Sequence, residues 1–155
     1  MPTYESGVYS FQDVQCSVTG PNIAVSVTGT ADEGYSVEQE GDKSTLTMGA
    51  NGDGMDSLHA KQNGTFMARL LKTSTLNRAF CNAYNYQTAS AANHGQNTIV
   101  IDDPVRGDTL TMLGCAFKKF PNISYAIEGG TQDWAFTCKR IEYGLGDGTT
   151  VTFNG

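Results

Sequence analysis

A chain of 155 residues is long enough for one domain with its own hydrophobic core. A net charge of −6 argues against electrostatic capture of nucleic-acid phosphates, and no apolar run approaches the ~20 residues of a membrane-spanning helix. Residues 1–7 show neither the basic region nor the apolar core of a secretory signal. Charged residues make up only 17% of the chain, while Gly, Thr, Ser and aromatic residues are plentiful, which favours a mainly β domain.

The charge is distributed unevenly along the chain. Residues 1–60 carry nine acidic residues and one basic residue, whereas residues 61–155 carry seven acidic and nine basic residues. Two interpretations stay open. Either both halves interleave in one fold and the asymmetry averages out, or the subunit has a more acidic and a less acidic surface and stacks head to tail on copies of itself.

Alternation of apolar and polar residues predicts strands through most of the chain. The predicted strands cover residues 8–11, 14–18, 23–27, 35–40, 43–48, 64–72, 98–101, 109–120, 123–127, 133–139 and 149–153. The turn pair Gly41-Asp42 predicts that residues 35–40 and 43–48 form a hairpin, and Gly114 is the expected bend of the strand 109–120. The polar face of this hairpin carries Ser36, Glu38, Glu40, Thr45 and Thr47. Exposure to solvent is the simplest interpretation of that face.

One helix is predicted, at about residues 74–86. Thr73-Ser74-Thr75 offers hydroxyls that can accept from the free N–H groups of a first helical turn. Apolar residues then follow at helical spacing, at positions 76, 79, 80, 83 and 84. A helix this short is marginal alone in water, so we expect it to lie against the sheet.

A long loop is predicted at about residues 49–63, and long loops in compact domains are usually functional or partner-bound. Its acidic residues do not form a calcium loop, because Met55 falls where a ligand should be and no Glu closes the loop.

No motif predicts catalysis, a metal or a cofactor, so we expect a protein that is not an enzyme. Cysteines at positions 16, 81, 115 and 138 lie far apart and flank neither histidine, which argues against zinc. We expect free, mostly buried thiols, with pairing of Cys16 to Cys115 or Cys138 left open. The tripeptide Arg106-Gly107-Asp108 matches an integrin-binding motif, but a turn with a salt link accounts for it.

An ordered set of stretches makes the chain resemble the small structural proteins that form the inner tail tube of contractile-tailed bacteriophages. These stretches are Tyr9–Gln15, Glu38–Gly54, Ser57–Ala60, Arg69–Ser74, His94–Asn97, Asp103–Asp108, Cys115–Pro121 and Trp134–Phe136. The resemblance is collinear and covers nearly the whole chain, and its weight comes from the set because no single stretch is diagnostic.

The resemblance implies one domain over residues 1–155, with arms at residues 1–7 and 145–155. The implied fold is a β-sandwich or barrel of two packed antiparallel sheets with one flanking helix. Six copies would close into a ring, and stacked rings would form a tube in the virion tail, assembled in the host cytoplasm, through which DNA passes without specific binding. The implied partners are further copies and the sheath, baseplate, tape-measure and tail terminator proteins. A ring of a type VI-like or contractile injection system is the alternative, and a soluble β-sandwich binding module is a second.

The resemblance also suggests three groups of assembly residues. The polar hairpin face, Ser36, Glu38, Glu40, Thr45 and Thr47, is the candidate lumen face. The candidate ring-stacking loop comprises Asn51, Asp53, Met55, Asp56, Leu58 and His59. The candidate contacts of the helix with a neighbour or with the sheath are Asn77, Arg78, Asn82 and Asn85.

Overall fold

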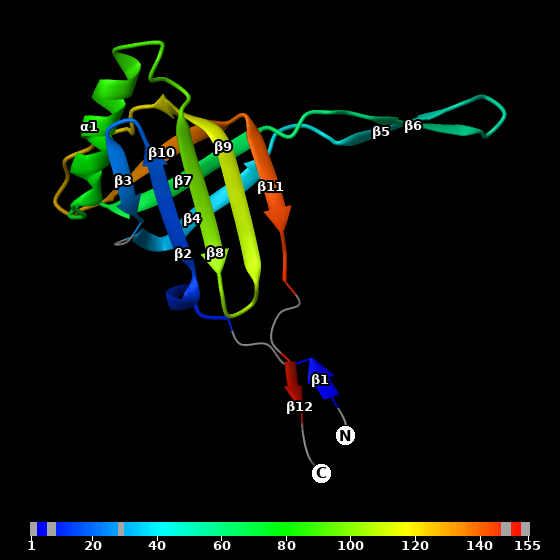
Figure 1. The fold of residues 1–155 in the computed structure, drawn as a ribbon, viewed down its shortest axis with the longest axis horizontal. Coiled ribbons are helices and arrows are strands. Elements are labelled where there is room, and N and C mark those ends of the chain that lie inside the picture. The colour runs from blue at the N-terminus through cyan, green and yellow to red at the C-terminus, as the bar shows by residue number, and fades with distance from the viewer. Residues whose placement is uncertain (1–2, 6–8, 28–29, 147–149, 153–155) are drawn as a thin grey trace.

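The structure is a computed structural model that describes residues 3–5, 9–27, 30–146 and 150–152. Most of these residues lie in strands, so the predicted mainly β class is confirmed (Figure 1). The strands are β1 (Thr3–Glu5), β2 (Gln15–Gly20), β3 (Ile23–Ser26), β4 (Thr30–Gln39), β5 (Ser44–Met48), β6 (Gly54–Leu58), β7 (Gly64–Leu71), β8 (Asn97–Asp103), β9 (Asp108–Lys119), β10 (Thr131–Cys138), β11 (Arg140–Gly144) and β12 (Thr150–Thr152). The helical elements are the 3₁₀ turn η1 (Phe11–Asp13) and the helix α1 (Leu76–Thr88).

The large sheet is antiparallel and has the order β3-β2-β8-β9-β10-β7-β4, with β11 paired to β9. The sequence predicts two packed sheets. In the structure the two layers are joined through β9, which belongs to both, so that they form one continuous sheet. Residues 109–113 of β9 pair with β11, and Ala116–Lys119 pair with β10. Between them Gly114 has a φ of 63°, and the register with β8 shifts there, which is typical of a bulge that bends a strand. The bend predicted at Gly114 is therefore confirmed, and the described strands form no closed barrel.

The core lies between the two layers. In β7, Gly64, Phe66, Ala68 and Leu70 are buried, while the residues between them are half-buried on the other face. This period of two places every second residue against the opposite layer. Gly64 illustrates how closely the layers approach, because a β-carbon there would overlap the side chain of Ile141 in β11. We refer to this sheet together with α1 as the body.

The helix α1 begins and ends two residues later than predicted, and it braces the body. Phe80 is fully buried, with its ring centroid 5.4 Å from that of Trp134 and 5.9 Å from that of Phe136. The N-cap residue, Thr75, makes no side-chain cap hydrogen bond, but the hydroxyl of Ser74 before it accepts from the backbone N–H of Leu76 at 3.3 Å.

A buried pair of amides ties the end of α1 to the sheet. Gln87 and Asn97 are both fully buried and exchange two hydrogen bonds of 2.8 and 2.7 Å. Gln87 also donates to the carbonyl of Pro21 at 2.9 Å, and Asn97 donates to the carbonyl of Cys115 at 3.1 Å. Because both amide nitrogens and both oxygens have partners, this polar pair can sit in the core without an unpaired group.

Four local predictions were wrong. Residues 35–40 do not form a hairpin with residues 43–48, because β4 pairs with β7 and β5 pairs with β6. The predicted long loop at residues 49–63 is partly strand, since its middle forms β6. Residues 123–127 form no strand and pair with no described strand. The predicted strand 8–11 lies partly outside the described residues, and Phe11 begins η1 instead.

Candidate assembly surfaces

The hairpin of β5 and β6, which we call the arm (residues 41–59), projects from the body (Figure 1). Its tip is a tight turn in which Gly49 N–H donates to the Asp53 carbonyl at 2.6 Å and Gly52 has a φ of 94°. The Asn51 side chain donates to the Asp53 carboxylate at 2.8 Å and closes the same turn. At the base, His59 N–H donates to the Lys43 carbonyl at 2.8 Å. Every residue from 40 to 56 is exposed, so the arm has no core of its own.

The register of the arm separates its residues into two faces. One face carries Leu46, Met48 and Leu58, which are 64%, 58% and 81% exposed, together with Asp56 opposite Leu46. We call this the apolar face of the arm. The other face carries Thr45, Thr47, Met55 and Ser57. An isolated two-stranded hairpin is marginally stable in water, so an arm of this kind needs a surface to cover it.

The six candidate ring-stacking residues all lie on this arm, but they do not share a face. Asn51 and Asp53 form the tip, and Met55 lies on the face opposite the apolar face of the arm. Asp56 and Leu58 lie on the apolar face. His59 lies at the base, where its ring is 3.3 Å from the Thr45 hydroxyl.

The structure divides the five candidate lumen residues between two places. Ser36, Glu38 and Glu40 are exposed on the outward face of the body at β4, where the Thr65 hydroxyl donates to the Glu40 carboxylate at 3.0 Å. Thr45 and Thr47 lie on the arm instead. The outward face at β4 continues across β7 and β10, where it carries Arg69, Asp133 and Thr137 together with the apolar Met67, Leu71 and Ala135.

The helix candidates divide in a similar way. Asn77 is half-buried and engaged within the chain: its side chain donates to the Leu71 carbonyl at 2.9 Å and accepts from the Trp134 indole N–H at 3.0 Å. Arg78, Asn82 and Asn85 are exposed on the solvent side of α1.

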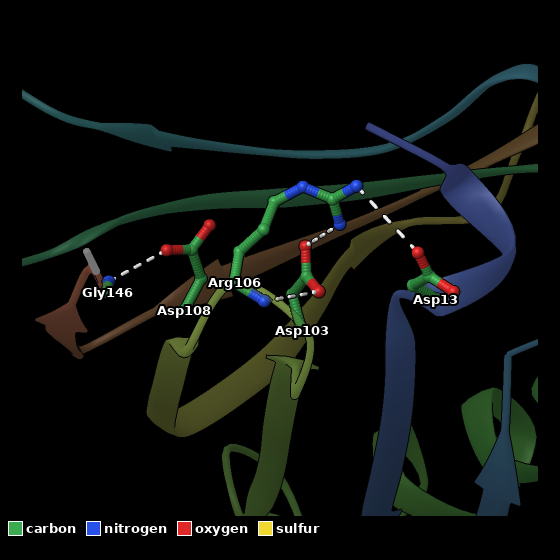
Figure 2. A network of polar contacts seen from close by, with 5 residues as sticks. All are labelled: Asp13, Asp103, Arg106, Asp108 and Gly146. Atoms are coloured by element: carbon green, nitrogen blue, oxygen red, sulfur yellow. Dashed lines mark hydrogen bonds and ion pairs between the residues drawn. The ribbon is translucent and has the colours of Figure 1, made fainter. Parts of the chain in front are cut away.

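The turn between β8 and β9 holds together segments from both ends of the chain (Figure 2). The Arg106 guanidinium lies 2.6 Å from the Asp103 carboxylate and 3.8 Å from that of Asp13, so a salt link forms in this turn with partners outside the tripeptide Arg106-Gly107-Asp108. The Asp108 carboxylate accepts from the backbone N–H of Gly146 at 2.9 Å. Burial by itself would raise the pKa of Asp103, but the hydrogen bonds and charge of Arg106 outweigh it and lower that pKa. The sequence pattern predicts a salt link in this turn but not its partners, nor the contacts with residues 13 and 146.

β3 and β4, the two ends of the strand order of the large sheet, each have an open edge within the described part of the chain. A third open edge belongs to β11, whose only partner among the described strands is β9. An exposed edge is a row of unpaired backbone donors and acceptors that can pair with another chain.

All four cysteines are free, and burial raises the pKa of the Cys16 thiol to about 12. Cys115 and Cys138 lie side by side in the core with their sulfurs 3.2 Å apart. Across the described ranges, no group of three or more His, Cys, Asp or Glu residues is arranged to hold a metal ion. Nor does any described helix combine the length and apolarity needed to cross a membrane.

Comparison with known proteins identifies the family. The family model described as the bacteriophage PhiTE tail tube protein matches residues 6–146, and the chain belongs to this family. It is therefore a structural protein of a phage tail, as the resemblance predicted. A search of curated proteins found no match.

Chains in solved structures of contractile injection systems are similar to this chain. A chain from the cryo-EM structure of the PVC sheath/tube terminator of an extracellular contractile injection system is similar with a TM-score of 0.57 at 10% identity. This match covers 91% of the present chain and 99% of the other. A chain from the PVC sheath–tube complex in the extended state has a TM-score of 0.48 at 10% identity, covering 84% and 88%.

Proposed function

We propose that the protein is the repeating subunit of the inner tail tube, in which six copies close into a ring and rings stack into a conduit for phage DNA. The observation that carries this proposal is the arm. Its apolar face is exposed in the single chain, and exposed apolar patches mark sites of protein association. In a tube, that face is covered by a neighbouring copy.

The open edges of β3 and β4 support ring closure. An edge strand that meets an edge of the next copy continues the sheet from subunit to subunit and removes both edges. The outward face at β4 is polar, and we assign Ser36, Glu38 and Glu40 of this face to the lumen. Acidic side chains there repel DNA phosphates, so that DNA slides past without binding.

The finer parts of this proposal concern the partners. The exposed helix residues Arg78, Asn82 and Asn85 are assigned to contacts with a neighbour or with the sheath. The two terminal segments, residues 1–7 and 145–155, act as terminal arms of a single domain and are distinct from the arm of β5 and β6. The baseplate, tape-measure and tail terminator proteins meet the ends of the tube. Membership of a phage family favours this role over a secreted injection-system ring or a soluble binding module.

Removal of the arm tests the proposal. Glu40 N–H donates to the Asn63 carbonyl at 3.0 Å, so the two ends of the arm lie close enough to be joined by a short Gly/Ser linker in place of residues 42–60. The arm-less chain should fold as a soluble monomer, whereas the wild-type chain forms rings or tubes with a central channel by negative-stain microscopy. Tubes that form equally well without the arm would contradict the proposal.

A further inference from the structure

A second exposed apolar surface lies on the connection between β9 and β10, which we call the β9–β10 loop (residues 120–130). Ile123, Tyr125 and Ile127 of this loop are 41%, 87% and 105% exposed. They alternate with Ser124 and Ala126 in the pattern that predicts a strand, yet no described strand pairs with them. The pattern therefore lacks the partner that it needs within the chain.

The loop and the arm lie at opposite ends of the molecule. In Figure 1 the β9–β10 loop is the gold segment beside α1, whereas β5 and β6 extend in the other direction. One chain therefore cannot bring its own arm onto its own loop. Two unlike surfaces at opposite ends of one subunit can form a head-to-tail contact, which repeats from copy to copy.

The charges around the two surfaces are complementary. The apolar face of the arm has one charged side chain, Asp56, which has no partner in the described part of the chain. The β9–β10 loop follows directly on Lys118 and Lys119, which are both exposed. A third lysine, Lys72, lies over the Tyr125 ring, with its ammonium 3.7 Å from the ring centroid.

Those three lysines outnumber the single acid of the loop, Glu128. Complementary charges that flank apolar contacts set the register and orientation of an interface. An acid within one apolar surface and lysines beside the other therefore favour contact between the two surfaces over contact of either surface with its own copy.

We propose that the arm of one copy binds the β9–β10 loop of the next copy. Leu46, Met48 and Leu58 pack against Ile123, Tyr125 and Ile127, and Asp56 pairs with Lys118 or Lys119. The loop then finds a backbone partner in the unpaired edge of the arm, because a third strand stabilises a two-stranded hairpin. This inference rests on the proposed tube function and identifies the surface that receives the arm.

Charge reversal tests the pairing. Asp56→Lys should raise the protein concentration needed for assembly by at least about tenfold, because it places like charges together. The pair Lys118→Asp with Lys119→Asp should do the same, and combining all three substitutions should restore assembly. Asp42→Lys, which lies beyond the paired strands of the arm, is the control and should assemble as the wild type does. Normal assembly of Asp56→Lys, or failure of the combined variant to assemble, would overturn the proposal.

A cross-link tests the contact directly. In a Cys81→Ser background, Leu58→Cys with Ile127→Cys should give ladders of linked chains when assembled protein is oxidised. Leu58→Cys with Val105→Cys is the control, because Val105 is also exposed but lies on the turn after β8. Tubes that form without the 58–127 link would refute this interface and leave the tube function standing. Wild-type chains that stay monomeric under all assembly conditions would contradict both this interface and the proposed tube function.

Discussion

The body and the arm are built from the same kind of strand but are stabilised in different ways. In the body, Phe66, Ile99 and Phe136 are fully buried against other elements of the same chain. In the arm, Leu46, Met48 and Leu58 face solvent, and the hairpin is held by its backbone bonds, its turn and a few exposed polar contacts such as that of His59 with Thr45. The body is therefore packed against its own chain, whereas the proposed tube would cover the arm with a second copy.

The largest expected effect is on the core beneath α1. Phe80→Ala should lower the free energy of unfolding by about 3–5 kcal/mol, because it leaves a cavity among Phe117, Trp134 and Phe136. Urea unfolding of the arm-less monomer measures this effect without interference from assembly. Tyr86→Ala, an exposed position on the same helix, is the control and should change the value by no more than about 0.5 kcal/mol. Equal losses for the two variants would mean that α1 does not brace the core.

A smaller effect is expected at the buried amide pair. Asn97→Ala should cost about 1–3 kcal/mol, because the buried amide oxygen of Gln87 then loses its hydrogen-bond donor. Replacing both residues by apolar side chains of similar size, Asn97→Leu with Gln87→Met, should cost less than the sum of the two single changes. Strict additivity in urea unfolding would show that the two amides do not act as a pair.

A pH effect is expected at the turn between β8 and β9. Because Arg106 lowers the pKa of Asp103 below its ordinary value of 3.8, the folded state binds fewer protons there than the unfolded state. The stabilisation is complete above that ordinary value and is lost as the pH falls through the lower pKa of the folded state. Asp103→Asn and Arg106→Gln should each flatten the decline of unfolding free energy in acid. A decline of unchanged steepness in both variants would rule out this ion pair as its source.

The smallest effect on stability is expected in the arm. Leu58→Ala should leave the free energy of unfolding of the unassembled chain within about 0.5 kcal/mol of the wild type, because Leu58 is already exposed. The same change should weaken assembly, as sedimentation at increasing protein concentration would show. A large loss of monomer stability would place Leu58 in a contact with the body and remove the difference between the two regions.

Sequence patterns predicted the body better than the arm for a physical reason. The alternation in residues 64–71 and the helical spacing from Leu76 to Tyr84 record which side of each element is buried, so both elements were found. Periodicity does not record which strand is the partner. Gly41 and Gly52 both have a positive φ, and the earlier one was interpreted as the hairpin turn although the chain turns at the later one. The Gln87–Asn97 pair was missed because the two amides meet only once the helix lies against the sheet.

Residues 123–127 also show that a sequence pattern does not identify the partner of a strand. Their alternation predicts a strand, but a strand forms only where it pairs with another, and no described strand pairs with these residues. Local pattern therefore identified a segment suited to pairing without identifying its partner. Of the candidate assembly residues, the sequence located the exposed acids of β4 and the residues of the arm, but it could not separate the two faces of the arm.

Hydrogen exchange of the arm, measured before and after assembly, tests the central claim most directly. Amides of β5 and β6 should exchange rapidly in the unassembled chain and slow by more than about tenfold in tubes, whereas amides of β7 should be protected in both states. This result would show that a second copy stabilises the arm. Arm amides that are already protected in the monomer, or that still exchange rapidly in tubes, would contradict the account.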